Sequence, residues 1–379
     1  MRRAEDSAQA RLVQTQPHCF EGRFVAIVEK TQQSKTSVET SIDATLDQID
    51  AHLYALDVRP LQEQQDVNVP VCPICDSASA TPTFSVEGVQ VDVVVCDSCG
   101  LGRLHPMPSP EEIAAFYPPD YYGDSGGKFH RLTEKMVRWV ASRRAQFLCR
   151  GLSPGDRVLD VGCGRGVLLE AFANAGLEAH GFEISPDAAR GVDDRAHIRT
   201  AGSLPQAEYP SQFFDRVVIW HVLEHVRAPR ATISEIHRIL KPGGQIVVAV
   251  PNFSSWQAQW AKADWFHLDL PRHLYQFPLD GLKQLLSNCE FDVQSEHHFS
   301  LRQNPFGWVQ SSLNRSRVVP RNSLYVMLQR GQTGSVSALG RFRAWLMHYL
   351  GMPVALGISL VAAMFRRGAS VHVVATAKK

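Results

Sequence analysis

The chain has 379 residues, of which 44% are hydrophobic and 20% are charged. This composition is ordinary for a globular protein, and the length suffices for one large domain with an appendage or for two domains. Its 39 Lys and Arg residues nearly balance its 38 Asp and Glu residues, leaving a net charge of +1. An even charge balance argues against broad electrostatic capture of nucleic acid, so we disfavour a nucleic-acid partner.

Residues 1–70 are rich in Gln, Ser, Thr and Asp, and we expect a weakly ordered segment with one helix over Val38–Leu56. No apolar run follows the charged start of the chain, so we expect no secretory signal. The predicted location is therefore the cytoplasm, with association with a membrane as the alternative.

Two closely spaced cysteine pairs follow, in the sequences CPIC and CDSC. The spacing C-x2-C-x20-C-x2-C suits four thiolates around a tetrahedral Zn²⁺, with a hairpin between the pairs that turns near Gly88. An iron–sulfur cluster and unligated thiols are the alternatives. We predict a small zinc-ribbon-like module over residues 71–123, with Zn²⁺ as a structural cofactor. The expected metal ligands are Cys72, Cys75, Cys96 and Cys99.

Residues 124–379 alternate between strand-like and helix-like patterns, which predicts an α/β domain with a mostly parallel sheet and helices on both faces. An amphipathic helix is expected over residues 131–149, and Ser185 is expected to cap a further short helix. The strand-like segments are RVLDVG, EAHGFEI, HIRTA, FDRVVIW, QIVVAV, FDVQSEHHF and VHVVATA.

The segment VLDVGCGRG, residues 158–166, follows a strand and opens a helix. Its glycines let the backbone pass close to a ligand, in a GxGxG spacing rather than GxGxxG. Asp160 before this loop suits a ligand that carries an ammonium group and no pyrophosphate. Glu183 ends the next strand, where an acid can accept hydrogen bonds from both hydroxyls of a ribose. A tight turn with a solvated Glu183 is the alternative.

In order and spacing, VLDVGCGRG, GFEIS, FDRVVIWHVLEHV and LKPGG resemble the class I S-adenosylmethionine-dependent methyltransferases over about residues 155–300. The resemblance implies a Rossmann-like sheet of seven strands with an antiparallel last strand, and S-adenosylmethionine as cofactor. It places the methionine part on Asp160 and the glycine loop, the ribose on Glu183, and the adenine beside Ser203 and Leu204. Many relatives carry an Asp where this chain has AGSLP, which is a departure at the adenine. The implied cofactor-binding residues are Asp160, Gly162, Cys163, Gly164, Gly166, Glu183, Ile184, Ser203 and Leu204.

Methyltransferases of sugar and natural-product pathways carry a similar cysteine-pair module before a Pro- and Tyr-rich stretch. That resemblance implies a lid beside the active site. Three tyrosines either reach the substrate pocket or only pack: Tyr117, Tyr121 and Tyr122.

The segment HVLEHV leaves a buried strand at the edge where ligands lie in open α/β sheets. Methyl transfer is an in-line displacement, so the enzyme aligns the nucleophile and removes its proton. We predict a base or an orienting group among His221, His225 and His273, while Glu224 caps backbone N–H groups. A metal is the alternative, since RNA-end 2′-O-methyltransferases use an ExxEH sequence and ubiquinone-pathway enzymes share EVLEH. A histidine at the first position disfavours Mg²⁺.

Two long connections are expected inside this domain. Residues 251–277 are aromatic and predict a cap that encloses the substrate, or an extra helical layer. An apolar insertion covers about residues 300–367, and residues 344–365 contain no charged side chain. Because Gly351 and Pro353 interrupt the run, we expect a helical hairpin or an interfacial segment, either buried or packed in a homodimer, with peripheral contact to a membrane surface as the alternative.

The predicted function is methyl transfer from S-adenosylmethionine to an oxygen or carbon of a small-molecule acceptor, such as a sugar, a glycan or a lipid-linked intermediate. An RNA-end or quinone-type O-methyltransferase is an alternative. A zinc-ribbon binding protein with an inactive methyltransferase fold is another.

Overall fold

The computed structural model describes residues 56, 58–61, 70–86, 91–117, 131–190, 192–328 and 336–378, without the side chains of residues 131–138. The expected helix over Val38–Leu56 lies outside these residues apart from its last position. The predicted turn near Gly88 and the candidates Tyr121 and Tyr122 also lie outside them.

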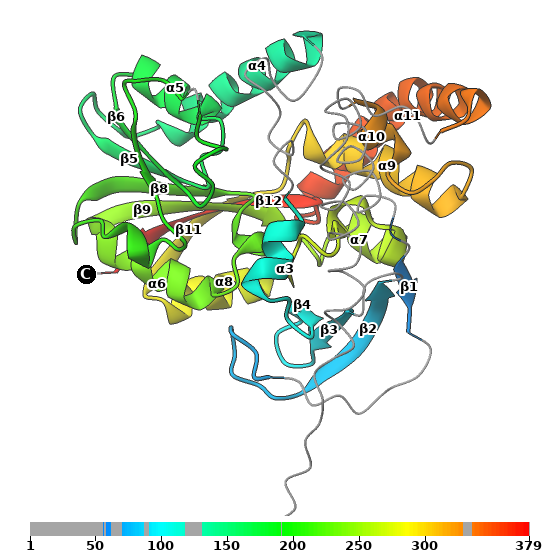
Figure 1. Ribbon diagram of the computed structural model, residues 1–379, viewed down its shortest axis with the longest axis horizontal. Helices are drawn as coiled ribbons and strands as arrows, with labels where there is room; N and C mark the ends of the chain where they lie inside the picture. Colours follow the sequence, from blue (N-terminus) through cyan, green and yellow to red (C-terminus); the bar gives the residue numbers. More distant parts are fainter. Residues whose placement is uncertain are drawn as a thin grey trace, which may run out of the picture. The chain divides into compact units, whose positions relative to one another are not determined.

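Seven strands form one sheet in the order β11-β12-β9-β8-β5-β6-β7 (Figure 1). The parallel strands are β5 (Arg157–Val161), β6 (Glu178–Glu183), β7 (His197–Thr200), β8 (Phe214–Trp220) and β9 (Leu240–Pro251).

The last strand, β12 (Ser370–Ala377), runs antiparallel between β9 and β11 (Phe291–His297). The predicted Rossmann-like sheet with an antiparallel final strand is therefore confirmed.

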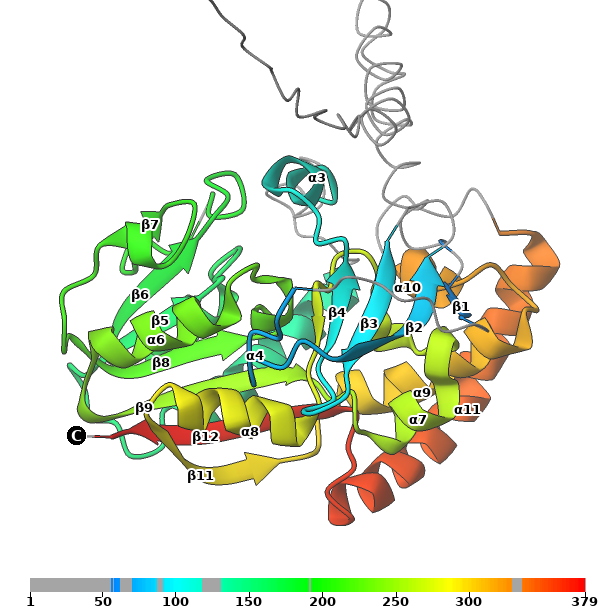
Figure 2. The same ribbon diagram turned by 90° about the horizontal axis from the view of Figure 1, so that it is seen from below.

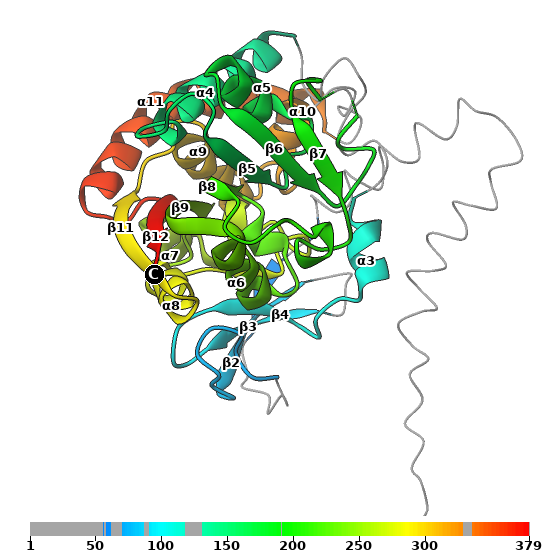
Figure 3. The same ribbon diagram turned by 90° about the vertical axis from the view of Figure 1, so that its left-hand side faces the viewer.

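Helices cover both faces of this sheet, which is why its central strands are apolar without alternation. Helices α4 (Arg131–Leu148) and α5 (Val167–Asn174) lie on one face. Helices α6 (Pro229–Ile239) and α8 (Leu279–Asn288) lie on the other, as Figures 1 and 3 show.

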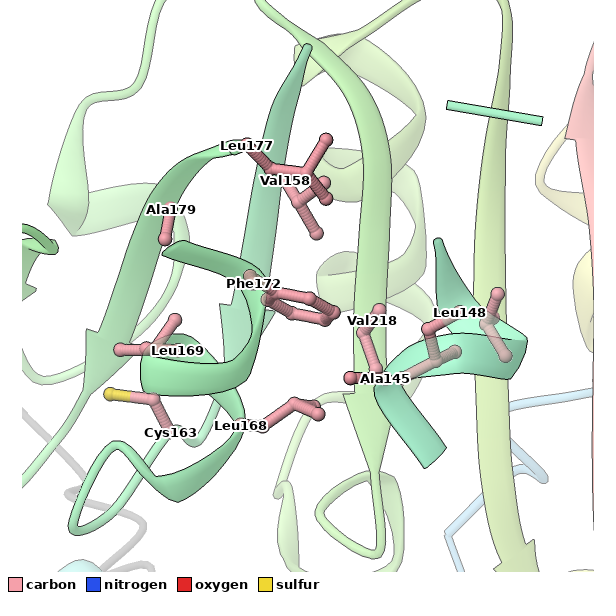
Figure 4. Close-up of a cluster of buried hydrophobic side chains, with 11 residues drawn as sticks. Ala145, Leu148, Val158, Cys163, Leu168, Leu169, Phe172, Leu177, Ala179 and Val218 are labelled. Carbon is pink, nitrogen blue, oxygen red and sulfur yellow. The ribbon is translucent and has the colours of Figure 1, made fainter. Parts of the chain in front are cut away.

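The core beneath α4 and α5 joins these helices to the parallel strands (Figure 4). Phe172 of α5 is fully buried and points toward Val218 of β8, with Leu148 of α4 nearby. Burial of a side chain of this size contributes about 1.5–3 kcal/mol. This packing fixes the start of α5, and with it the glycine loop that comes before the helix.

The cysteine pairs belong to a second, antiparallel sheet in the order β1-β2-β3-β4-β10. Strands β2 (Ala80–Val86) and β3 (Asp92–Cys96) pair as expected for a hairpin. The outer strands are β1 (Val58–Pro60), β4 (Gly102–His105) and β10 (Tyr275–Gln276). Because β10 comes from the segment after β9 and pairs with β4, the two sheets are connected there; Figure 2 shows β4 and the main seven-stranded sheet.

Hydrogen bonds also join the first cysteine pair to helices α6 and α8 of the seven-stranded sheet. Arg230 of α6 donates to the carbonyl oxygens of Pro73 at 2.8 Å and Ile74 at 2.9 Å. Asn288 of α8 donates to the Ile74 carbonyl at 2.7 Å.

The segment after β9 forms a helical layer of α7 (Trp256–Ala261) and two short 3₁₀ turns, Lys262–Asp264 and Phe266–Leu268. Trp265 is fully buried in this layer, whereas Trp256 and Trp260 are exposed. One expected element is absent: residues 186–190 form turns rather than a helix, although Ser185 Oγ still accepts the Ala188 N–H at 3.3 Å.

Three helices lie between β11 and β12: α9 (Gln303–Ser316), α10 (Ser323–Leu328) and α11 (Ala338–Met364). The predicted helical hairpin is wrong, since α11 runs without a break through Gly351 and Pro353. Ala344 and Ala355 pack on the same hydrophobic cluster on either side of Pro353, and this packing outweighs the one missing N–H group.

The expected burial of this apolar segment is also wrong. Helix α11 is long and apolar enough to cross a membrane, and only 17% of its most apolar stretch is buried.

Candidate functional site

The loop after β5 has a backbone that only glycine adopts easily. Gly162, Gly164 and Gly166 have φ values of +74°, +49° and +68°. A Cβ on Gly162 would lie 2.5 Å from Val222 Cγ2, and one on Gly166 would lie 2.5 Å from Val192 Cγ1. A Cβ on Gly164 would meet nothing within 4 Å. The loop is therefore packed at both ends and open at its middle, where a ligand has room.

Glu183 at the end of β6 holds this loop in place. Its Oε2 accepts the Gly164 N–H at 3.0 Å, and its Oε1 accepts the N–H groups of Ile184 at 2.8 Å and Ser185 at 3.1 Å. These three hydrogen bonds fix the position of the carboxylate between the loop and the end of β6. The adjacent Ile184 side chain is exposed, which leaves an apolar surface beside the carboxylate for a flat ring.

Asp160 lies on β5 directly before the loop and is buried. Burial and the nearby charge of Glu183 raise the pKa of its carboxyl, and the charge of Arg144 lowers it. The net pKa is about 7. The environment thus favours a neutral carboxyl unless a cation arrives. An ammonium group on a ligand would supply that cation. Burial also raises the pKa of the Cys163 thiol, so this residue acts as packing rather than as a nucleophile.

The remaining cofactor candidates follow β7. Leu204 is buried and Ser203 is exposed, immediately before the 3₁₀ turn Pro205–Ala207. In the described residues, no hydrogen bond joins either of them to the glycine loop. Their place at the carboxyl end of the third strand is the sole support for an adenine contact.

His221 leaves β8 in a left-handed conformation, with φ of +53°. Its N–H donates to the Ala249 carbonyl at 2.8 Å, which holds it at the sheet edge. Its Nδ1 lies 3.2 Å from Glu224 Oε1, and its Nε2 lies 3.3 Å from Ser370 Oγ. Burial and the charges of two arginines lower the pKa of His221 well below its usual range. This histidine is therefore neutral at pH 7, with both ring nitrogens engaged.

His225 and His273 face each other across the turn, with ring centroids 4.6 Å apart. His225 Nδ1 lies 3.0 Å from the Arg272 carbonyl and 2.9 Å from Tyr117 Oη. Because a carbonyl only accepts, we assign the proton to Nδ1, and Nε2 then carries the lone pair. The same argument applies to His273, whose Nδ1 lies 2.9 Å from the His267 carbonyl.

Charge is distributed unevenly around this pair. Burial and the neighbouring His225 lower the pKa of His273 to about 4, so it is neutral at pH 7. Although burial alone would raise it, Arg272 and His273 lower the pKa of Asp269 to about 2. Asp269 therefore stays ionised, 3.8 Å from His273 Nε2.

Glu224 lies beneath the same pair. In the part of the chain that the structure describes, its Oε2 is buried without a hydrogen-bond partner, and burial raises the pKa of this carboxyl. The expected capping role of Glu224 stays a prediction, since the residue at the N-cap of the 3₁₀ turn Leu223–His225 is Val222. One ligand atom each of Glu224, His225 and His273 lies within 4.8 Å of the others, which is close enough to share a metal ion.

Two residues of this site had no signal in the sequence. Arg144 of α4 is half-buried and places its guanidinium 4.2 Å from the centre of the Trp220 ring, where its charge acts on Asp160 and His221. Ser370 reaches His221 only because β12 pairs with β9 in a register that sets Ser370 opposite Pro251.

The four cysteines of the module lie together, with all four sulfur atoms within 4.8 Å of one another. The Sγ atoms of Cys72 and Cys99 are 3.5 Å apart, as are those of Cys75 and Cys96. A tetrahedral Zn²⁺ with Zn–S bonds of about 2.3 Å needs sulfur atoms about 3.8 Å apart, so the set fits zinc. Against the effect of burial, backbone N–H groups of Cys99 and Ser98 lower the pKa of Cys96 to about 7, which favours a thiolate.

Comparisons with known proteins agree with this geometry. Residues 130–296 match the family model of a methyltransferase domain. The chain is 32% identical over 133 residues to the ubiquinone biosynthesis O-methyltransferase of Thiobacillus denitrificans, a match that covers 32% of this chain and 53% of that protein. It is 35% identical over 132 residues to the protein of the same name from Pseudomonas entomophila, covering 32% of this chain and 53% of that protein. The chain thus spans about half the length of the curated relatives it matches.

Among solved structures, a SAM-dependent methyltransferase from Archaeoglobus fulgidus superposes with a TM-score of 0.42 at 20% identity, over 65% of this chain and 97% of that one. The matched residues 130–296 contain all five parallel strands of the seven-stranded sheet.

Proposed function

We propose that this protein transfers a methyl group from S-adenosylmethionine to a hydroxyl oxygen of a small-molecule acceptor. The observation that carries the proposal is the common edge of Asp160, Glu183 and His221, at the carboxyl ends of three adjacent parallel strands. Ligands of open α/β sheets lie at this edge, so a cofactor on the glycine loop would face His221, His225 and His273.

Each part of the cofactor has a matching group on this chain. Asp160 would accept hydrogen bonds from the ammonium group, and the open middle of the loop at Gly164 would take the methionine backbone. Glu183 would accept the ribose hydroxyls, and Ile184 would cover one face of the adenine. When bound, S-adenosylmethionine supplies a methyl group that its sulfonium charge has already activated.

The chain itself must then position the acceptor and take its proton. We assign the proton transfer to His225 Nε2, because Nδ1 is fixed by the Arg272 carbonyl and the ring is half-exposed. His221 has both nitrogens engaged and acts as a positioning residue for Glu224. His273 packs edge-on against His225 and orients its ring.

A metal-assisted version of the same reaction is the second candidate. The unpartnered Glu224 Oε2 favours it, since a buried carboxylate oxygen with two imidazoles nearby is a usual metal-binding set. A bound ion would orient the acceptor oxygens and ease loss of the proton. Added Mg²⁺, Mn²⁺ or Zn²⁺ would then raise the rate of protein freed of metal at this site.

Two classes of acceptor are supported by different features of this chain. Two relatives are named for O-methylation in ubiquinone biosynthesis, which supports a hydroxylated aromatic ring as the acceptor. The cysteine-pair module instead suggests a sugar, glycan or lipid-linked intermediate. We propose Zn²⁺ as the structural ion of that module, which closes against α6 and α8 through Arg230 and Asn288.

The test is transfer of a labelled methyl group from S-adenosylmethionine to pools of hydroxylated aromatics and of sugars. We expect label in one pool, and a rate for His225→Ala lower by a factor of about 10²–10⁴ with unchanged cofactor affinity. Cofactor binding without transfer to any acceptor would instead support an inactive fold. If His225→Ala transferred the methyl group at the wild-type rate, His225 would be excluded as the general base.

A further inference from the structure

The apolar side of α11 has the reverse of the usual helix arrangement. Its buried members are all small, whereas most of its large apolar side chains are exposed. Trp345, Met347 and Met352 are partly buried against the neighbouring core. Tyr349, Leu350 and Val354 are 69%, 67% and 63% exposed. The buried residues of α11 are Gly340, Ala344, Ala355, Ser359 and Ala362.

An exposed apolar surface of this length indicates an interaction site. The exposed residues extend from Leu339 at the first turn to Phe365 just past the end of the helix. Figures 2 and 3 show α11 on the outer side of α9. We call the surface formed by Leu339, Phe342, Leu346, Tyr349, Leu350, Val354, Ile358, Val361, Met364 and Phe365 the α11 face.

The part of the sequence that contains α11 is strongly basic. Residues 297–379 contain nine Arg and two Lys residues and no Asp or Glu. All 38 acidic residues therefore lie before residue 297, against 28 basic ones, and the two parts carry charges of +11 and −10. The even charge of the whole chain conceals a strongly basic C-terminal part.

Arginines flank the α11 face, with Arg341 and Arg343 near the start of the helix and Arg366 and Arg367 just after its end. Arg343 and Arg367 are exposed and have no carboxylate partner in the described residues, and Arg341 donates to the Val336 carbonyl. Arg366 is paired with Glu296, with Nε 2.6 Å from Oε1. A second copy of the chain would bring the exposed Arg343 and Arg367 of two basic surfaces together, so charge repulsion opposes a homodimer here.

Aromatic side chains border the same face. Trp256 of α7 lies beside Phe365, with ring centroids 5.4 Å apart, and both are exposed. Trp260 is also exposed and lies under the guanidinium of Arg315, 5.4 Å from its ring centre. Tryptophan and arginine at the edge of an apolar surface are typical of the interface between lipid head groups and acyl chains.

Helix α11 is held along its length, so it cannot cross a bilayer. Ala344 and Ala355 pack in one cluster with Val309 and Leu313 of α9. Just after the helix, the Gly368 and Ala369 carbonyls accept hydrogen bonds from Asn252, and β12 begins. The helix of 27 residues, about 40 Å long, is therefore available only from its side.

We propose that the α11 face binds in plane to the surface of an anionic phospholipid bilayer. Large apolar side chains enter the head-group boundary, and the arginines at both ends meet lipid phosphates. Ser370, five residues beyond Phe365 in the chain, lies 3.3 Å from His221, so the bound bilayer lies near the carboxyl edge of the main sheet. This proposal goes beyond the proposed methyl transfer and does not depend on it.

The test is flotation of the full chain with vesicles of phosphatidylcholine alone and of phosphatidylcholine with an equal share of phosphatidylglycerol. We expect binding to the anionic vesicles at least about tenfold stronger, weakening as salt is raised. The double variant Leu350→Asp/Val354→Asp should lose this binding. Val293→Asp, at an exposed apolar position on β11, is the matched control and should bind as wild type does.

Both α11 substitutions replace exposed side chains, so thermal unfolding should stay at the wild-type temperature, which separates lost binding from lost folding. Equal binding to both vesicle types would overturn the proposal, as would anionic binding that the double variant retains. A dimer in light scattering that the double variant splits, without vesicle binding, would also overturn it.

Discussion

Asp160 should show a conflict between stability and cofactor binding. Burial raises the pKa of its carboxyl from 3.8 to about 7, so the ionised form costs up to about 4 kcal/mol in the cofactor-free protein at pH 8. Asp160→Asn removes that charge and keeps the shape of the side chain. We expect the variant to be more stable than wild type by about 1–2 kcal/mol at pH 8, which raises its melting temperature by about 2–8 °C.

The gain must depend on pH in one direction. A carboxyl with a raised pKa is neutral in both the folded and the unfolded state below pH 3.8, and there it costs nothing. Between pH 3.8 and about 7 the unfolded state loses the proton first, so wild-type stability falls as pH rises. Asp160→Asn lacks this loss, and its advantage should be small at pH 5 and full at pH 8.

Cofactor binding should change the opposite way. A neutral amide cannot balance an ammonium group, so we expect Asp160→Asn to bind S-adenosylmethionine at least about tenfold more weakly at pH 8. Thermal unfolding with and without the cofactor, at pH 5 and pH 8, measures both effects in one series. A stability difference that is the same at both pH values would refute the burial argument. Unchanged cofactor affinity would refute the placement of the ammonium group.

Three further results are expected. Gly162→Ala should destabilise the protein by about 1–3 kcal/mol more than Gly155→Ala, because both positions have positive φ but only the first clashes; equal melting temperatures would contradict this. Cys72→Ser should lose the bound zinc, measured by elemental analysis, and lower the melting temperature, whereas Cys289→Ser should keep the metal; full zinc content in Cys72→Ser would contradict the cluster. For His225→Gln, the rate of methyl transfer should fall while the Kd of the cofactor, measured by calorimetry, stays unchanged. A rate of this variant that rises with added Mg²⁺ would favour the metal-assisted reaction.

The main sheet could be predicted because its physics is local. Strands covered on both faces are continuous apolar runs, such as Val217–Ile219 in β8, and the helices α5 and α6 that follow β5 and β8 along the chain each have an apolar stripe. The glycine loop could be read for the same reason, since its conformation is imposed within nine residues. The spacing of the two cysteine pairs likewise predicted that Cys72 and Cys99 lie close together.

The rest depends on contacts that spacing does not encode. Ser370 meets His221 across 149 positions through the register of β12, and β10 joins a sheet that begins far earlier in the chain. Pro353 predicted a break in a helix that packing holds together. The net charge of +1 also concealed the basic C-terminal part, because charge summed over a chain carries no position.

The measurement that tests the central claim most directly is calorimetric titration of the full chain with S-adenosylmethionine, beside Glu183→Ala and the control Asp292→Ala. Glu183 accepts the Gly164 N–H of the loop and the N–H groups of Ile184 and Ser185 after β6, whereas Asp292 is an exposed residue of β11. We predict one site per chain in wild type and in Asp292→Ala, and binding weaker by at least about tenfold in Glu183→Ala. No binding to the wild-type chain, or equal binding in all three proteins, would contradict the account.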